Sequence, residues 1–252
     1  ADYSALYGAS TSIEILSSQT PLPPPSISSA TFSSNGVFIG VVLTAPSDKA
    51  QQKGVFTCNN LFAFSGASSS QCQWQDASTV QISLPSDSPL VPGSSLSLLA
   101  GSVRAFCGVD VSSDFCATWT AAAAKTVLIG RPVSAVTPSV VLSMPGLIGL
   151  CDNMVVDFVG STGSGGRAWK GITVAVDSLS TNISKVKDFV AATDSTTTGR
   201  IVIPNSLLEA AYAYKWTVRL CNFFDVCGEA SARVGISNSA IPLVSILGQS
   251  LR

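Results

Sequence analysis

Short apolar runs, separated by clusters of Gly, Pro, Ser and Asp, recur along the whole chain. The run at residues 37–43 starts as an alternation and becomes fully apolar, whereas residues 214–220 alternate between apolar and polar throughout. Alternation with a period of two indicates a half-buried β-strand, and the intervening clusters are typical of turns. The pattern therefore predicts an all-β chain of many short strands.

The expected strands form two groups, which lie on either side of Gly130-Arg131-Pro132. The first group is 37–43, 79–84, 96–98 and 126–129; the second is 139–144, 154–158, 171–176, 200–203, 214–220 and 230–236. An Ig-like β-sandwich needs about 100 residues, so a chain of 252 residues has room for two. We predict two tandem Ig-like β-sandwich domains, over residues 26–130 and 131–239.

Two segments depart from the strand pattern. Ile183, Val186 and Val190 have the spacing of one face of a short helix, which we expect to cross between two strands. The four alanines at 121–124 predict a single helical turn.

Both ends of the chain lie outside the two expected domains. Residues 1–25 hold one plausible strand, at 12–16, and a Pro-rich tract at 21–25 that predicts a stiff, extended spacer. Residues 240–252 begin with a pattern similar to that of 136–142, as if a further module started there. We expect part of a longer array, in which the arm at 13–16 or the tail at 242–247 completes a neighbouring sheet.

Two missing sequence signals also indicate that the chain is part of a longer protein. No signal peptide opens the chain, and no run reaches the roughly 18 apolar residues of a membrane span. These observations favour a mature segment of something longer.

The chain carries little charge, with 14 Lys and Arg against 15 Asp and Glu. Charged residues make up 12% of the chain, about half the usual share for a soluble domain. A net charge of -1 does not favour binding to nucleic acid or to an anionic membrane. Ser and Thr supply the polarity instead, and a surface so poor in charge predicts attached glycans or a large buried interface.

Histidine is absent, which removes the most frequent general base and the commonest transition-metal ligand. A serine or cysteine hydrolase of the usual type would therefore lack its base. A glycosidase-like carboxylate pair would need residues such as Asp152 and Asp157, whose odd spacing places them on opposite faces of a strand. We expect no catalytic activity, no cofactor and no bound metal.

Two loops resemble ligand sites only in part. The segment Gly163-Ser164-Gly165-Gly166-Arg167 lacks the Gly-Lys-Ser/Thr of a phosphate loop, and a strand-like run follows it instead of a helix. We expect a turn in which Arg167 pairs locally. Asp110 and Asp114 lack the Asp-x-Asp-x-Asp/Asn-Gly pattern of a calcium loop.

Seven cysteines in a Ser- and Thr-rich β protein predict an oxidising compartment. In the first domain we expect a Cys58–Cys72 bridge beside a buried Trp74, and Cys107–Cys116 as a local clasp. In an Ig-type strand order, the remaining three lie at opposite ends of the second domain: Cys151 at one end, and Cys221 and Cys227 at the other.

Strands of about 20 Å separate those ends, whereas bridged Cα atoms lie within about 7 Å of each other. We therefore predict a Cys221–Cys227 bridge and leave Cys151 unpaired, free to bridge another module or subunit. The competing Cys151–Cys221 pairing would require a different topology.

Two kinds of attached sugar are consistent with this compartment. Asn182-Ile183-Ser184 is the only N-glycosylation sequon in the chain. Pro23, Pro24 and Pro25 are candidates for sugars on hydroxyproline, if the protein belongs to an algal or plant wall.

The order of these motifs resembles the receptor-for-egg-jelly (REJ) module, which occurs in extracellular regions of the polycystin family. In the first half the similarity rests on Ser28-Ser29-Ala30-Thr31-Phe32-Ser33-x-x-Gly36, Cys58, Cys72-x-Trp74, the 79–84 strand and Pro92-Gly93. In the second half, residues 151–157, 161–167 and Tyr214-x-Trp216-x-Val218 are similar to the adjoining Ig-like part. The resemblance spans residues 21–236. The Trp-Asp-Phe-Gly-Asp-Gly signature of polycystic-kidney-disease repeats is absent, so that repeat is not identified.

Residues and resemblance together predict a non-catalytic structural or interaction segment of a long secreted or cell-surface protein. The resemblance implies one of two roles, and the high Ala, Ser and Val content with the proline tract favours the first, a filament or appendage component such as a green-algal flagellar mastigoneme. The alternative is an ectodomain module of a polycystin-like receptor, or of a channel's extracellular partner. Expected partners are neighbouring modules or subunits of the same assembly, or else a membrane channel or coat glycoprotein. A carbohydrate-binding module is a further alternative, with Tyr3, Tyr7 and Trp169 as its aromatic candidates.

Overall fold

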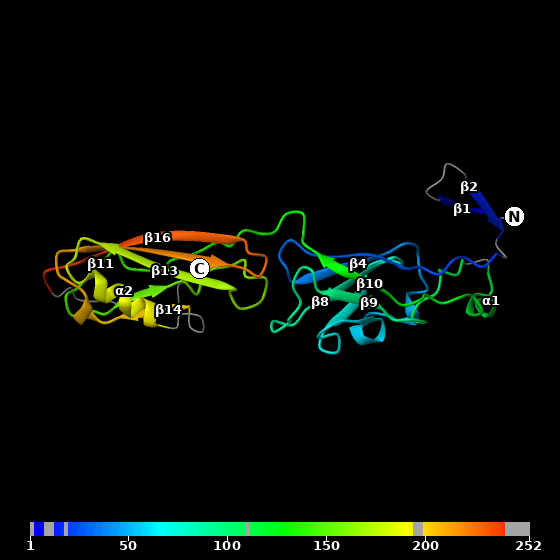
Figure 1. Cartoon of the computed structure of the whole chain (residues 1–252), viewed down its shortest axis with the longest axis horizontal. Helices are drawn as coiled ribbons and strands as arrows, with labels where there is room; N and C mark the ends of the chain where they lie inside the picture. The colour runs from blue at the N-terminus through cyan, green and yellow to red at the C-terminus, as the bar shows by residue number, and fades with distance from the viewer. Residues whose placement is uncertain (1–2, 8–12, 18–19, 109–110, 194–198, 240–252) are drawn as a thin grey trace, which may run out of the picture. The chain divides into compact units, whose positions relative to one another are not determined.

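The computed structural model describes residues 20–108, 111–193 and 199–239, together with the backbone of residues 3–7 and 13–17. It divides into two compact units, Ala1–Ala135 and Val136–Arg252, so the division falls five residues after the expected one at 130. Strands dominate both units, and the described residues contain two short α-helices (Figure 1). The prediction of an all-β chain is confirmed.

In the first unit, eight strands follow one another in the hydrogen-bonded order β5-β7-β8-β4-β3-β10-β9-β6. β3 lies in the middle, because it pairs antiparallel with β4 and parallel with β10. The strands are β3 (Ile27–Phe32), β4 (Phe38–Leu43), β5 (Val55–Thr57), β6 (Phe62–Ala63), β7 (Gln71–Trp74), β8 (Thr79–Ser83), β9 (Ser95–Leu98) and β10 (Lys125–Gly130).

This order is that of an Ig-type sandwich, in which strands A, B, E and D form one sheet and C, F and G the other. β3, β4, β8 and β7 take the places of A, B, E and D, and β6, β9 and β10 take those of C, F and G. Both sheets contribute fully buried apolar side chains, which are Ile39, Val41, Val80 and Ile82 from the first and Leu96, Leu98 and Ile129 from the second.

The second unit has the same plan in two separate sheets, β11-β16-β15-β13 and β12-β14. β12, β13, β14, β15 and β16 occupy the places of B, C, E, F and G, and β11 runs parallel to the last strand, as β3 does to β10. The strands are β11 (Leu147–Ile148), β12 (Met154–Asp157), β13 (Gly171–Ser178), β14 (Arg200–Ile203), β15 (Ala213–Cys221) and β16 (Cys227–Ile236).

The core of the second unit lies between these two sheets and a helix. Tyr214, Trp216, Val218 and Leu220 alternate along β15 and are fully buried, as the pattern predicted. The helix α2 (Ile183–Ala192) connects β13 to β14 and adds buried Val186 and Val190 to the same core. The predicted helix and its inward face are confirmed.

Two predicted elements are wrong. Residues 121–124 form no helical turn, because Ala122 exchanges backbone hydrogen bonds with Gly101 and Val103 of a neighbouring loop. Residues 139–144 form no continuous strand; only isolated bridges join Ser139 to Thr162 and Ser143 to Asp157. Between them, the Ser161 hydroxyl accepts the Val141 N–H and so replaces a ladder bond.

The N-terminal segment differs from the expected arm and spacer. Where one strand was expected, β1 (Tyr3–Tyr7) and β2 (Ile13–Ser17) pair with each other as a two-stranded antiparallel hairpin. The Pro-rich tract is part of the first unit, because Pro25 is buried and Leu22 packs beside Trp119. Residues 240–252 lie outside the described residues, so the expected tail strand stays a prediction.

The remaining elements are short. They are the α-helix α1 (Ser113–Ala117) and three 3-10 turns, η1 (Lys49–Gln51), η2 (Cys58–Asn60) and η3 (Asn205–Leu207). The Ser112 hydroxyl accepts the Phe115 N–H and caps α1. Asp110 of the rejected calcium loop lies outside the described residues.

Candidate interaction surfaces

Three disulfides close local loops, and each lies within one unit. They join Cys58 to Cys72, Cys107 to Cys116 and Cys221 to Cys227, across sequence separations of 14, 9 and 6 residues. These are the three predicted pairs. Cys151 is an exposed free thiol.

The tryptophan beside a disulfide is not the expected one. Trp74 is only half-buried, and it lies at the end of β7, beyond Gln73, the last residue there that pairs with β5. The buried one is Trp119, 4% exposed, which packs with Cys116 and meets the Phe115 ring edge-on. The Cys107–Cys116 clasp therefore anchors a small second cluster of the first unit.

Cys151 lies in the loop between β11 and β12, where its carbonyl accepts a hydrogen bond from the Asn205 side chain. Ile148, just before it, pairs with Ile236 at the end of β16, whereas Cys227 begins that strand. Ten strand residues rise about 33 Å, far beyond the reach of a disulfide. A bridge from Cys151 to Cys227, or to its cross-strand partner Cys221, is thus incompatible with this fold.

The two carboxylates weighed as a catalytic pair have separate structural partners. Asp152 precedes β12 and accepts the Gly149 N–H, so the expected placement on opposite faces of one strand is wrong. Asp157 pairs across strands with Arg200, whose guanidinium lies 2.6 Å from its carboxylate. The Arg200 hydrogen bond, with a second from the Val159 N–H, lowers the pKa of Asp157 and keeps it ionised.

Glu209 is a polar anchor that sequence reasoning missed. Its carboxylate accepts hydrogen bonds from the Ser180 hydroxyl and from both the N–H and the hydroxyl of Thr181. These bonds, led by that of Ser180, lower the pKa of Glu209. The carboxylate ties the segment before α2 to the loop before β15.

The Gly-rich loop is a turn between β12 and β13, and a strand follows it as predicted. The guanidinium of Arg167 lies 4.2 Å from the ring centroid of Phe223, so the arginine contacts the β15–β16 turn. Burial lowers the pKa of Arg167. The loop is a packing element of the second unit.

The candidate modification and sugar-binding residues differ in accessibility. Asn182 is half-buried at the N-cap of α2, and Pro23 is exposed, whereas burial of Pro25 removes it from the candidates for attached sugars. Trp169 packs against the core of the second unit, which argues against an exposed platform. The side chains of Tyr3 and Tyr7 lie outside the described part of the chain.

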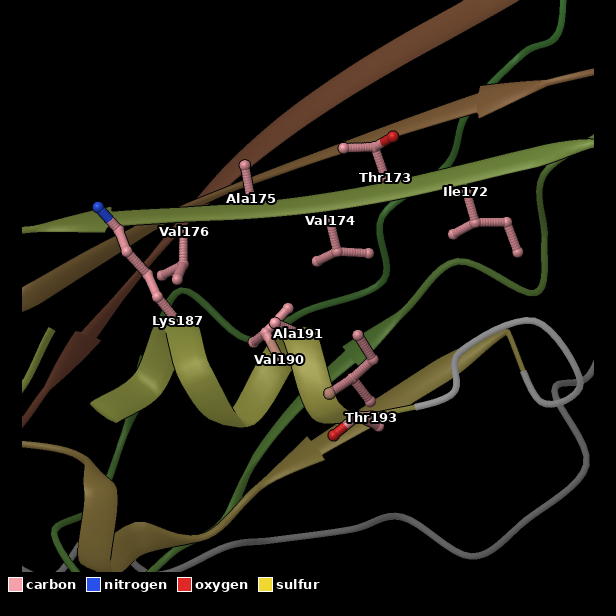
Figure 2. A pocket seen from close by; sticks show the side chains of 10 residues that line it. Ile172, Thr173, Val174, Ala175, Val176, Lys187, Val190, Ala191 and Thr193 are labelled. Atoms are coloured by element: carbon pink, nitrogen blue, oxygen red, sulfur yellow. The ribbon is translucent and has the colours of Figure 1, made fainter. Parts of the chain in front are cut away.

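A groove of 530 Å³ runs between β13 and α2 in the second unit. Figure 2 shows Ile172, Val174 and Val176 pointing from β13 toward the helix, while Thr173 and Ala175 point to the other side. Among the described residues that line the groove, Lys187 is the only charged one, and none is Asp, Glu or Cys. The groove can accept apolar side chains, and its described lining contains no acid–base pair.

Neither a metal centre nor a membrane helix is found in the described ranges. No group of three or more His, Cys, Asp or Glu side chains there could hold a metal ion. No helix of this part of the chain is long and apolar enough to cross a membrane.

No protein-family model matches the chain, and no curated protein matches it. Similar solved structures include the eight N-terminal Ig domains of Down syndrome cell adhesion molecule, at 10% identity and a TM-score of 0.32. That match covers 85% of this chain and 24% of the other, so this chain spans about a quarter of that fragment.

Two shorter Ig proteins are also similar. The Ig1-2 module of the Drosophila receptor tyrosine phosphatase DLAR has 9% identity and a TM-score of 0.25, covering 85% of this chain and 100% of that one. The complex of Dpr11 IG1 with DIP-gamma has 11% identity and a TM-score of 0.31, covering 85% and 98%. Likenesses of this size carry no argument about function, and the Ig-type assignment rests on the strand order described above.

Proposed function

We propose that this chain is a non-catalytic, extracellular structural segment of a long modular protein that forms a filament or surface appendage. The observation that carries the proposal is the presence of two Ig-type β-sandwiches in tandem, the first with two disulfides and the second with one. Disulfides of this kind persist in oxidising compartments outside the cytosol.

The chemistry of the surface supports a structural role. Charged residues make up 12% of the chain and histidine is absent. The carboxylates that were weighed for catalysis are bound to Arg200 or to backbone N–H groups. Such a chain is better suited to lasting contacts with its neighbours than to acid–base chemistry.

The resemblance to the REJ and Ig-like region supports an appendage of the mastigoneme type on a cilium or flagellum. Neighbouring modules of the same assembly are then its main partners. An ectodomain of a polycystin-like receptor would use the same sandwiches, but would hold them at the plasma membrane.

Immunogold electron microscopy of intact producing cells tests the proposal. An antibody against the exposed face of α2 should decorate extracellular fibres at a regular spacing. Labelling confined to the plasma membrane would instead favour the receptor, and labelling confined to the cell interior would overturn both.

A further inference from the structure

Among the described residues, β13 is the longest strand at the edge of a sandwich sheet. Its only strand partner in the described part of the chain is β15, and the order of the sheet ends there. β13 has eight residues, whereas the other strands at sheet edges, β5, β6, β11, β12 and β14, have two to four. On the side of β13 that faces away from β15, the backbone N–H and C=O of every second residue can pair with another strand.

The usual protection of such an edge is missing from the first six residues of β13. Edge strands are commonly shielded by short length, charged side chains or proline. Residues 171–176, Gly-Ile-Thr-Val-Ala-Val, contain neither a charge nor a proline, and the one charged residue of β13 is the exposed Asp177 near its end. By contrast, β14 begins with Arg200, which is paired to Asp157. The edge of β13 therefore needs a cover.

The groove beside this edge suits the side chains of an added strand. Ile172 and Val174 are only half-buried and point toward α2, where they line the groove (Figure 2). A strand paired with β13 would direct alternate side chains to the same side, into the 530 Å³ space. Main-chain bonds would supply affinity, and the groove would select apolar residues.

The β1–β2 hairpin of the chain joins neither sandwich sheet in the described part of the structure. Among the described residues, β1 and β2 pair only with each other. A hairpin of two strands alone is marginally stable in water, and a third strand is needed for independent stability. Its strands have five residues each, short enough to pair fully along β13. They contain one charged residue, Glu14, whereas the acceptor side carries charges of both signs, Lys187 at the groove and Asp177 on β13.

We propose that the β13 edge of one copy accepts the β1–β2 hairpin of a second copy, which extends the four-stranded sheet. Donor and acceptor are different surfaces, so the contact is head-to-tail and can repeat from copy to copy. Such a contact generates open fibres or closed rings. The biological role of this contact rests on the proposed function, but the contact itself can be measured in solution.

Photo-cross-linking of the full 252-residue chain tests which segment pairs with the β13 edge. A photoreactive benzoylphenylalanine replaces exposed Ala175 on β13, and unlabelled and ¹⁵N-labelled chains are mixed. We expect cross-linked peptides that join position 175 of one isotope to residues 3–17 of the other. Cross-links within one chain, or to any other segment, would overturn the proposal.

Sedimentation velocity across a concentration series tests whether the chain associates through the β13 edge. The wild-type chain should form larger species, and Ala175→Lys should abolish them because it places a charge on the open edge. Ala213→Lys, the same change at an exposed position on the interior strand β15, should leave them intact. Circular dichroism checks that both variants fold, and Thr173→Lys serves as a second edge variant.

Removal of residues 1–19 should abolish association as Ala175→Lys does. Association that persists without them, or a wild-type chain that stays monomeric at every concentration, would overturn the proposal. Failure of the immunogold experiment alone would reject the appendage role and leave the strand exchange standing.

Discussion

Cys221 and Cys227 are the last cross-strand pair of the β15–β16 hairpin, and a disulfide joins them with their Cα atoms 4.0 Å apart. The same turn is held from inside by Asn222, which is 2% exposed. Its carboxamide donates to the carbonyls of Val136 and Gly163 and accepts the N–H groups of Phe224 and Val226. One covalent bond and one buried amide thus close this end of the second unit.

Asn222→Asp should destabilise the second unit by about 2 kcal/mol or more, since a carboxylate cannot donate to two carbonyls and would be buried beside them. Urea denaturation followed by hydrogen exchange in each unit measures this. Asn205→Asp is the matched control, because Asn205 makes one exposed side-chain donor bond, to Cys151. Equal losses in the two variants would contradict the role of Asn222.

Removal of the disulfides should cost stability in the order of their loop lengths. The chain-entropy relation gives roughly 2 kcal/mol for a loop the size of Cys221–Cys227 and about 3 kcal/mol for one the size of Cys58–Cys72. Burial of Cys58 and Cys72 adds to the difference, because double Ala variants there leave a void. The free energy of unfolding of each double variant tests the order, and the reverse order would count against it.

Gly228→Ala should destabilise the second unit strongly, because a Cβ there would lie 1.9 Å from the carbonyl oxygen of Pro138. That neighbour is backbone and cannot turn aside, so the segment before β11 would have to move. Gly146→Ala is the control, since an added Cβ meets nothing within 4 Å there. Thermal melts of the two variants should differ clearly; matching melting temperatures would show that the segment yields easily.

The Asp157–Arg200 pair should contribute to stability at neutral pH and be lost in acid. Hydrogen bonds from Arg200 and Val159 lower the pKa of Asp157 in the folded state below its unfolded value. The contribution is therefore present above the unfolded pKa of about 4 and is lost as pH falls through the folded pKa. Asp157→Asn should lower the urea midpoint at pH 7 and have less effect near pH 3.

Asp188→Asn, an exposed carboxylate on α2, is the control for that experiment. It removes the same charge without the Arg200 bond and should change the midpoint little at either pH. An equal effect of Asp157→Asn at both pH values would argue against the ion pair as the cause.

Cys151 should react with iodoacetamide in the native protein, with one thiol modified per chain, because it is exposed and the other six cysteines are bridged. Peptide mapping without reductant should recover Cys221 linked to Cys227. A peptide that joins Cys151 to either of them would refute the strand order of the second unit.

Local spacing was enough to predict several features of this protein. Alternation over 214–220 predicted the buried face of β15, because side chains on a strand alternate whatever the strand pairs with. The period of Ile183, Val186 and Val190 predicted α2 for the same kind of reason. The short loop between Cys107 and Cys116 predicted that bridge, since short loops bring their ends together readily. The Cys221–Cys227 bridge was predicted only with an assumed Ig-type strand order.

Where segments meet was decided only by the tertiary structure. Trp74 and Trp119 each lie near a cysteine in the sequence, but which of them is buried depends on the side chains that pack around each in the fold. Asn222 has no local signal, because its donor bonds reach carbonyls 86 and 59 residues away.

The open edge of β13 is the clearest case. Residues 171–176 are apolar enough for an interior strand, and the sequence alone indicates a strand there without saying which neighbours it has. The sheet order leaves β13 at the edge, beside α2, because strand pairing joins residues far apart in the chain. Alternation is a property of one segment and can be read from it, whereas an edge exists only relative to a partner.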